Sequence, residues 1–330
     1  MAKKQQDLKP DIILKNYWSS NEQFADFFNA VLFDGEQVIK PDELEDVDTE
    51  ESTILEHREY AESIKASRDV IKIQKKSSAH GVQFVMLGME GQEHIHYAMP
   101  MRVMGYDYGV YKKQYDSNAK KYKSADGLEE DEYLSRMKRT DKFVPVITVV
   151  VYYGEKAWDG AVSLYGMLDI PEKMKQFVND YKMLLIEARK NNLKLHNMEN
   201  RDLFNLLQIF LDKSIPKNEA KEKAIKYCDE HKTSKSVIMA VAGATNSKID
   251  YNAFEKGDGK MCTLVQEIAK EGEEKGKLEG KLEGEIKGTI KVLKRYNESD
   301  DNIINELISE FSISKGEAVE YLNKYNDGNL

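Results

Sequence analysis

The chain has 330 residues, of which 41% are hydrophobic and 32% are charged, and its formal net charge is −9. This length is enough to bury one sizeable core or two smaller ones. The longest apolar run, residues 144–153, contains Pro145 and is far too short for a membrane span, so it suits a buried strand.

The first eighteen residues hold four lysines but no apolar segment of signal-peptide type, and we expect a cytoplasmic protein. Only Cys228 and Cys262 occur, without paired spacing, which argues against a disulfide framework and a cysteine-based zinc site. Charge is segmented: residues 42–51 hold seven carboxylates and no base, whereas residues 111–123 hold five lysines against one aspartate. The acidic balance therefore does not exclude a nucleic-acid surface.

Apolar residues at helical spacing predict a helix over residues 21–33, with Asn21 as its N-cap and Asp34-Gly35 as its stop signal. The acidic stretch 41–62 predicts a solvated loop or a short helix. Its carboxylates lack the glycine-containing spacing of an EF-hand loop, so calcium binding of that kind is not expected.

Residues 69–74 alternate in polarity, residues 82–89 are mostly apolar, and a polar turn separates them, which predicts a β-hairpin. Pro100 suits the first turn of a following helix. Residues spaced as on one face of that helix are Met101, Met104, Tyr108 and Tyr111. Residues 115–131 predict a lysine-rich and then acidic surface segment, and residues 143–153 predict a strand buried on both faces.

After Pro171 the pattern indicates helices throughout. The expected helices of this half are 172–190, 199–213, 217–231, 235–243 and 300–311. Ser314 and Glu317 form a capping box that opens a last short helix to about Tyr325.

Residues 271–288 differ in kind, because glycine recurs at every fourth position and leucine or isoleucine recurs two positions away. On a helix these two stripes lie on opposite faces. Five interior glycines cost about 5 kcal/mol relative to alanine, which predicts a marginal helix unless a partner covers it. A charged spacer and a seam for self-association are the two interpretations.

Glu90, Gly91 and Gln92 follow directly on the second strand of the expected hairpin, and Asp69 begins the first. In an antiparallel pair the start of one strand lies beside the end of the other, so the carboxylates of Asp69 and Glu90 can converge. Two carboxylates are a usual protein contribution to a Mg²⁺ site. The carbonyl of Gly91 is a candidate third ligand, and Gln92 alternates back to the face of Glu90, where it could hold the attacking water.

Two other interpretations of this stretch remain open. His94 and His96 would share one face of a strand and could bind zinc, although the sequence offers no obvious third ligand. Alternatively, Glu90 and Gln92 are simply exposed at a strand end, which composition alone favours.

Four stretches resemble the Rpn family of recombination-promoting nucleases, also described as transposase-like proteins of the PD-(D/E)XK type. They are NEQFADFFNAVLF, SRDVIKIQ, MLGMEGQEHIHYAMPMRVMGYDY and VPVITVVVYYGEKAWDGA. They lie within roughly residues 20–170, a range of about half of the chain. The Glu-Gly repeat and the short helical tail are also similar to that family's usual ending.

The resemblance implies an α/β fold with a restriction-endonuclease-like core, in which helices flank a mixed central sheet, and a helical C-terminal extension. The expected organisation is an N-terminal lead (1–20), a nuclease-like domain (21–195), a helical extension (196–264), a Glu/Lys/Gly repeat helix or spacer (265–290) and a small helical tail (291–330).

The same resemblance implies that Asp69, Glu90 and Gln92 are catalytic, and that Asp69, Glu90 and Gly91 hold Mg²⁺ or another divalent cation. Arg68 stands where the family motif has proline, and Gln92 stands where the wider superfamily usually has lysine. An amide carries no charge and no useful pKa, so the metal would have to activate the water and offset the phosphate charge.

An acid of the first helix, Asp26 or Glu22, could add or orient a ligand. Cations expected to grip a phosphate backbone without reading sequence are Lys72, Arg102, Lys112, Lys113, Lys120 and Lys121. A solvated surface is the alternative interpretation of the lysine run.

The expected function is a Mg²⁺-dependent DNA endonuclease that hydrolyses phosphodiester bonds in recombination or mobile-element DNA, with little sequence specificity. We expect no membrane partner, and self-association would use residues 271–330. The rival from another class is an inactive nuclease-fold protein that binds DNA or assembles. An RNA-directed nuclease of the same chemistry is a further alternative.

Overall fold

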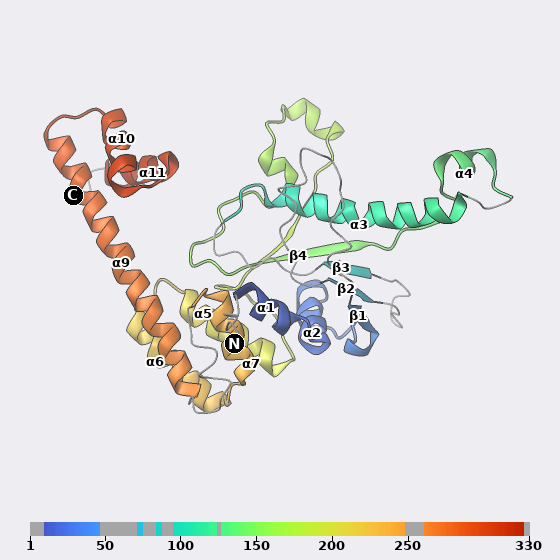
Figure 1. The fold of residues 1–330 in the computed structure, drawn as a ribbon, viewed down its shortest axis with the longest axis horizontal. Coiled ribbons are helices and arrows are strands. Elements are labelled where there is room, and N and C mark those ends of the chain that lie inside the picture. The colour runs from blue at the N-terminus through green and yellow to red at the C-terminus, as the bar shows by residue number, and fades with distance from the viewer. Residues whose placement is uncertain are drawn as a thin grey trace, which may run out of the picture. The chain divides into compact units, whose positions relative to one another are not determined.

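The computed structural model describes residues 10–46, 71–74, 84–87, 95–123, 127–247 and 261–326 (Figure 1). The chain divides into two compact units, which we call unit 1 (Met1–Ala269) and unit 2 (Lys270–Leu330). Unit 1 is mixed α/β, and the described part of unit 2 is helical. Among the described helices, none combines the length and apolar character needed to cross a bilayer.

Unit 1 contains a five-stranded sheet with its strands in sequence order. The strands are β1 (Leu44–Asp46), β2 (Ile71–Gln74), β3 (Phe84–Leu87), β4 (Val146–Tyr152) and β5 (Leu184–Glu187). The first three strands pair antiparallel, whereas β3, β4 and β5 pair parallel, so the sheet is mixed. The expected hairpin is confirmed in its described part, where Ile71 pairs with Leu87.

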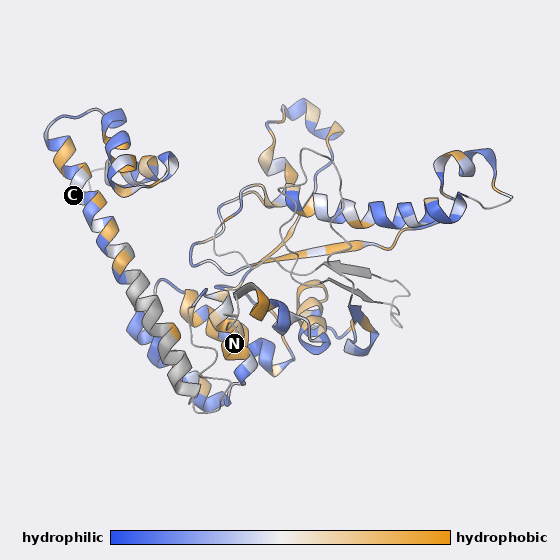
Figure 2. Ribbon diagram, viewed as in Figure 1, coloured by the Kyte–Doolittle hydropathy of each residue, from blue (hydrophilic) through white to orange (hydrophobic). Residues whose placement is uncertain are grey.

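Strand β4 is covered on both faces, as its run of valines predicts. Val149 and Val151 belong to a large core formed with the helices of unit 1, whereas Val150 packs in a second cluster on the other face. Figure 2 shows the apolar run of β4 beside the polar C-terminal half of helix α3.

The described helices of unit 1 before residue 261 are α1 (Pro10–Trp18), α2 (Asn21–Leu32), α3 (Met99–Tyr122), α4 (Glu130–Ser135), α5 (Met198–Leu211), α6 (Lys217–His231) and α7 (Lys235–Ala244). Helices α2, α5, α6 and α7 confirm the expected ranges to within two residues. The stop after α2 is also confirmed, because Asp34 and Gly35 both have positive φ, 53° and 91°.

The large core joins segments from across unit 1. Trp18 of α1 is fully buried, and its ring lies 5.0 Å from Phe27 of α2 and 6.4 Å from Phe204 of α5, measured between ring centroids. Its indole N–H donates to the hydroxyl of Tyr153, directly after β4, at 3.3 Å. The N-terminal lead, the sheet and the helical extension therefore share one apolar core.

The prediction of a helix over residues 172–190 is wrong. The chain forms the 3₁₀ segment η4 (Glu172–Phe177) and then β5. Leu184 to Ile186 pair with Val149 to Val151 of β4. Strand formation here depends on a partner more than thirty residues away, which the local spacing does not reveal.

The cap of α2 also differs from expectation. Ser20 occupies the N-cap position, and Asn21 is the first helical residue. The Asn21 side-chain amide donates to the carbonyls of Pro41, at 3.0 Å, and Leu44, at 3.1 Å. The acidic segment begins with the 3₁₀ turn η1 (Pro41–Glu43) and strand β1, and the pairing of β1 with β2 explains why a strand replaces the expected loop there.

Helix α3 begins at Met99, as Pro100 predicts, but it buries a different face from the expected one. Met101 and Tyr108 are 51% and 53% exposed. The residues that face the protein include Met99, Val103 and Tyr106. Val150 of β4 and Met183 supply the apolar partners on that side. The helix also continues to Tyr122, through the first half of the expected lysine-rich surface segment.

Unit 2 contains α9 (Met261–Arg295) from Lys270 onward, together with α10 (Asp300–Phe311) and α11 (Lys315–Asn326), which confirms the last two expected helices. Its buried cluster contains Ile286, Ile290, Ile303, Leu307, Ala318 and Leu322. The repeat lies within one continuous helix in spite of its glycines. A Cβ added at Gly280, Gly284 or Gly288 would meet nothing within 4 Å, so the packing of unit 2 does not require these glycines.

The capping box at the start of α11 is confirmed. Ser314 Oγ accepts the N–H of Glu317 at 3.3 Å, and the Glu317 carboxylate accepts the N–H of Ser314 at 2.8 Å. We predict that Ser314→Ala lowers the free energy of unfolding of unit 2 by about 1 kcal/mol. Urea denaturation followed by circular dichroism measures this change, and Ser309→Ala, on the exposed face of α10, is the matched control. Equal stability of the two variants would contradict the role of the cap.

Candidate functional site

The expected metal site borders the described strands β2 and β3. Asp69, Glu90, Gly91 and Gln92 lie outside the described residues, as does His94. The described part of this edge is the pair formed by Ile71, the first residue of β2, and Leu87, the last of β3. Lys72 lies on β2, where only the backbone is described. Within the described ranges, no three His, Cys, Asp or Glu side chains gather in a way that could hold a metal ion.

A buried carboxylate that the sequence analysis missed lies next to this edge. Thr148 of β4 pairs in register with Leu87, and its hydroxyl donates to Asp107 of α3 at 2.5 Å. The second carboxylate oxygen of Asp107 accepts a hydrogen bond from the hydroxyl of Tyr181. Asp107 is only 4% exposed. These bonds fix α3 to β4 at the residue that pairs with the last residue of β3, and we call them the Asp107 clamp.

The clamp depends on Tyr181 remaining a donor. Burial first, and then the hydrogen bond to Asp107, raise the pKa of the Tyr181 phenol well above its ordinary value, so the phenol stays protonated at neutral pH. Asp107 and its partners are 41 and 74 residues apart in sequence. No local motif links residues at such separations, and a lone aspartate in a polar helix gives no other signal.

We predict that Tyr181→Phe costs about 1 to 3 kcal/mol in the free energy of unfolding, because it removes a donor from a buried carboxylate. Urea denaturation at neutral pH measures the loss. Tyr108→Phe is the control, since the Tyr108 side chain is 53% exposed. A loss for Tyr181→Phe no greater than that of the control would show that the clamp contributes little.

Further side-chain contacts hold α3 alongside β4 and the segment that leads into it. Val146 N–H donates to the Tyr111 hydroxyl at 3.1 Å. Gln114 bonds the backbone of Val144 twice, at 2.7 and 3.0 Å. The Tyr122 hydroxyl donates to Asp141 at 3.0 Å. As α3 advances from residue 107 to 122, its partners descend from residue 148 to 141, so the two segments run antiparallel and are bonded at intervals over this range (Figure 1).

Two of the candidate side chains lie in the first turns of α3 or just before them. Arg102 donates from Nε and Nη2 to the hydroxyl of Tyr106, at 3.2 and 2.8 Å. His96 lies three residues before the helix and is half-buried. It belongs to no described group of three metal ligands, and zinc binding with His94 remains an untested prediction.

The lysines of α3 are not equivalent. Lys112 bonds both carboxylate oxygens of Asp116, at 2.5 and 2.6 Å, and this hydrogen bond raises its pKa. The pair carries no net charge, and Lys113 lies directly beside it in the helix. Lys120 and Lys121 are exposed, and neither forms an ion pair in the described structure. The free positive charge of α3 is therefore concentrated at its C-terminal end.

Cations from the segment after α4 join these lysines. Tyr122 links the two groups, because its buried ring lies 5.2 Å from the Lys121 ammonium and 5.6 Å from the Lys138 ammonium. Asp141 holds the arrangement by accepting the N–H of Lys138 at 2.9 Å. We call the resulting surface the end patch, which consists of Lys120, Lys121, Lys123, Lys138, Arg139 and Lys142.

The first-helix acids considered as additional metal ligands have other partners. Asp26 of α2 is 4% exposed, and its carboxylate accepts the backbone N–H of His196 at 2.7 Å and the side-chain amide of Asn200 at 2.8 Å. Glu22 accepts from the hydroxyl of Ser20 at 2.9 Å at the exposed start of α2. Asp26 thus joins α2 to α5 within the core.

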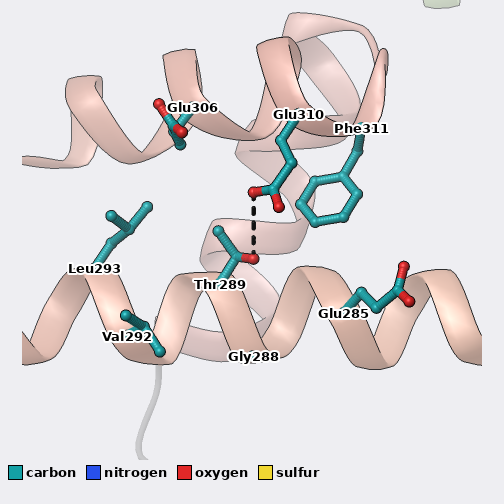
Figure 3. Close-up of a pocket in the computed structure, with 8 residues that line it drawn as sticks. All are labelled: Glu285, Gly288, Thr289, Val292, Leu293, Glu306, Glu310 and Phe311. Atoms are coloured by element: carbon teal, nitrogen blue, oxygen red, sulfur yellow. Dashed lines mark hydrogen bonds between the residues drawn. The ribbon is translucent and has the colours of Figure 1, made fainter.

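Unit 2 contains a separate groove of about 430 Å³ between α9 and α10 (Figure 3). It is lined by Glu285, Gly288, Thr289, Val292, Leu293, Glu306, Glu310 and Phe311. Thr289 donates to Glu310 across it at 3.5 Å. Its charged lining consists of Glu285, Glu306 and Glu310, and these side chains are not among any described group that could hold a metal ion, so the groove provides no metal site.

Comparison of the chain with protein-family models, with curated proteins and with solved structures finds no match.

Proposed function

We propose that this chain is a Mg²⁺-dependent DNA endonuclease of the PD-(D/E)XK type, akin to the Rpn recombination nucleases. The observation that carries the proposal is the antiparallel pairing of β2 and β3, in which Ile71 lies opposite Leu87. Asp69 precedes one of these residues by two positions, and Glu90 follows the other by three. Segments this short span at most about 7 to 11 Å, so the proposal needs no long-range movement to bring both carboxylates to one ion.

The arrangement of strands and helices around this edge also supports the proposed nuclease function. A mixed sheet flanked by helices is the arrangement expected of a nuclease core, and the parallel pairing of β3 and β4 through the crossover helix α3 gives that core its central unit. The strand end expected to carry the acids lies beside β4, the strand that is buried on both faces. A site at the border of a rigid core is well suited to hold charged groups in fixed positions.

The chemistry of the proposed donors fits a hard cation. Carboxylates of Asp69 and Glu90 and the carbonyl of Gly91 are all oxygen ligands, which Mg²⁺ prefers. When bound, Mg²⁺ supplies an acidified water and a charge that stabilises the phosphate in the transition state. The Gln92 amide, which can both donate and accept a hydrogen bond, orients the attacking water, and it contributes no charge of its own.

Binding of the DNA backbone is assigned to exposed cations of unit 1. Lys120 and Lys121 suit this role better than Lys112, because their charge is not cancelled by a neighbouring carboxylate. Arg102 lies nearer to the strand edge, one and a half turns of helix before Asp107. Contacts of this kind bind phosphate without reading base sequence, so we expect cleavage with little sequence preference.

Incubation of supercoiled plasmid with the purified full-length chain tests the proposal. Nicked and linear products that form with Mg²⁺, and are absent with EDTA, would support it. Intact plasmid under all conditions, together with salt-sensitive DNA binding, would favour the alternative of an inactive nuclease-fold protein that binds DNA or assembles. Preferential cleavage of RNA in a parallel reaction would reassign the substrate. Self-association through residues 271–330 and a cytoplasmic location remain predictions.

A further inference from the structure

The end patch gathers six cations, and the carboxylates bonded to its backbone are Asp141, at Lys138, and Glu132, at Arg139. Its six cations come from two separate segments, residues 120–123 and 138–142, and none of them forms an ion pair in the described structure. Lys120, Lys121, Lys123, Arg139 and Lys142 are exposed. The contacts of Tyr122 with Lys121, Lys138 and Asp141 hold the two segments together. Like charges are thereby kept close together before any ligand arrives, which favours an anion with several phosphates.

The end patch also lies at a fixed distance from the strand edge. The Asp107 clamp attaches α3 beside Leu87, and Lys120 lies thirteen residues further along the same helix. At 1.5 Å per residue this separation is about 20 Å. The contacts from Tyr111, Gln114 and Tyr122 to the segment 141–146 prevent the helix from swinging away from β4.

We propose that the end patch binds the phosphate backbone of duplex DNA about six base pairs from the phosphate that is cleaved. The inference rests on the proposed function for the position of the cleaved phosphate. Successive phosphates along one strand advance by about 3.4 Å, so about 20 Å corresponds to roughly six base pairs. A duplex must then exceed a minimum length to contact the end patch and the strand edge at the same time.

A duplex fits these observations better than a single strand. Single-stranded nucleic acid is usually held by bases that stack on exposed aromatic rings. The one ring at the centre of the patch, Tyr122, is only 4% exposed, and lysines from both segments lie over it. A duplex is stiff over a length of about 50 nm, so a fixed separation between two contact points selects it over a flexible chain.

The test compares hairpin duplexes of about five and about twenty base pairs, the first shorter and the second longer than the proposed span of roughly six. Binding is measured by fluorescence anisotropy in EDTA as a function of salt, and cleavage is measured separately in Mg²⁺. The variant is the triple substitution Lys120→Gln, Lys121→Gln and Lys138→Gln. The charge-matched control is Lys221→Gln, Lys223→Gln and Lys226→Gln on α6, and circular dichroism checks that both variants are folded.

We expect the wild-type chain to bind the long duplex at least about tenfold more tightly than the short one, because more phosphates are engaged. The triple end-patch variant should lower the slope of log K against log salt for the long duplex by about 2.7, which is about 0.9 for each lost contact. It should also lower the affinity for the long duplex until it is close to the affinity for the short duplex. The control triple should keep the wild-type preference for length.

Equal binding of the two duplexes, or an equal loss in the α6 control, would overturn the inference. Tighter binding of a single strand or of an RNA duplex of the same length would overturn it as well. Plasmid cleavage that does not depend on the end patch would support the proposed nuclease activity and argue against the end-patch contact. Patch-dependent binding without any cleavage would have the opposite meaning, because it would support the contact and argue against the nuclease.

Discussion

Replacement of Asp69 by asparagine is expected to lower the rate of Mg²⁺-dependent plasmid cleavage by about a hundredfold to a thousandfold or more, the scale seen when one electrostatic stabiliser of a transition state is removed. The substitution keeps the shape of the side chain but removes the charge that would hold the cation. Glu90→Gln should have an effect of the same order, because the proposed site places both carboxylates in one ligand set. Initial rates of loss of supercoiled plasmid, at several Mg²⁺ concentrations, measure both changes.

Asp229→Asn, on the exposed surface of α6, is the matched control and should retain the wild-type rate. The Asp69→Asn variant should unfold at a temperature similar to that of the wild-type chain. This result would show that the loss of cleavage comes from the site and not from unfolding. An Asp69→Asn protein that cleaves at more than about half of the wild-type rate would refute the assignment of Asp69 as a metal ligand. Such a change is far below the expected loss of about a hundredfold or more.

Trp18→Ala is expected to give the largest loss of stability, about 3 to 5 kcal/mol, which is the usual cost of deleting a buried aromatic ring. Trp18 is fully buried beside Phe27 and Phe204, and its indole N–H is bonded to Tyr153. Removal of the ring would leave a cavity where α1, α2 and α5 meet. Urea denaturation followed by circular dichroism, analysed at constant m value, measures the change.

Trp18→Phe should lose less than Trp18→Ala, because a phenyl ring keeps most of the aromatic contacts and loses only the hydrogen bond and part of the volume. Phe177→Ala serves as the surface control, since Phe177 is 73% exposed, and its effect should stay within about 0.5 kcal/mol. A loss below about 1 kcal/mol for Trp18→Ala would mean that α1 is not part of the cooperative core of unit 1.

The elements that depend on local signals were predictable from the sequence. Helices α5, α6 and α10 follow apolar spacing and lie close to their expected bounds. The capping box of Ser314 and Glu317 forms the expected pair of hydrogen bonds. In each case the residues that decide the structure lie within a few positions of one another, and so a linear reading contains the necessary information.

The elements that depend on distant partners were not predictable in this way. Strand β5 forms because Leu184 to Ile186 pair with β4, and α3 buries Val103 instead of Met101 because Val150 and Met183 lie on that side. The repeat, expected as a helix or a spacer, forms part of the continuous helix α9, and its marginal stability remains a prediction. Of the candidate site, the hairpin was predictable, whereas the Asp107 clamp was not, because its members are far apart in sequence.

The shared core of unit 1 has a consequence for the chain during its synthesis. Tyr17 bonds to Asn200, 183 residues away, and the adjacent Trp18 packs on Phe204 of the same distant helix. At the usual elongation rate, the ribosome takes about 10 to 40 s to make the chain between these two points. Throughout that time the aromatic residues of α1 and α2 have no α5 to cover them. The nascent chain therefore exposes an apolar N-terminal segment to chaperones well before the core of unit 1 can close.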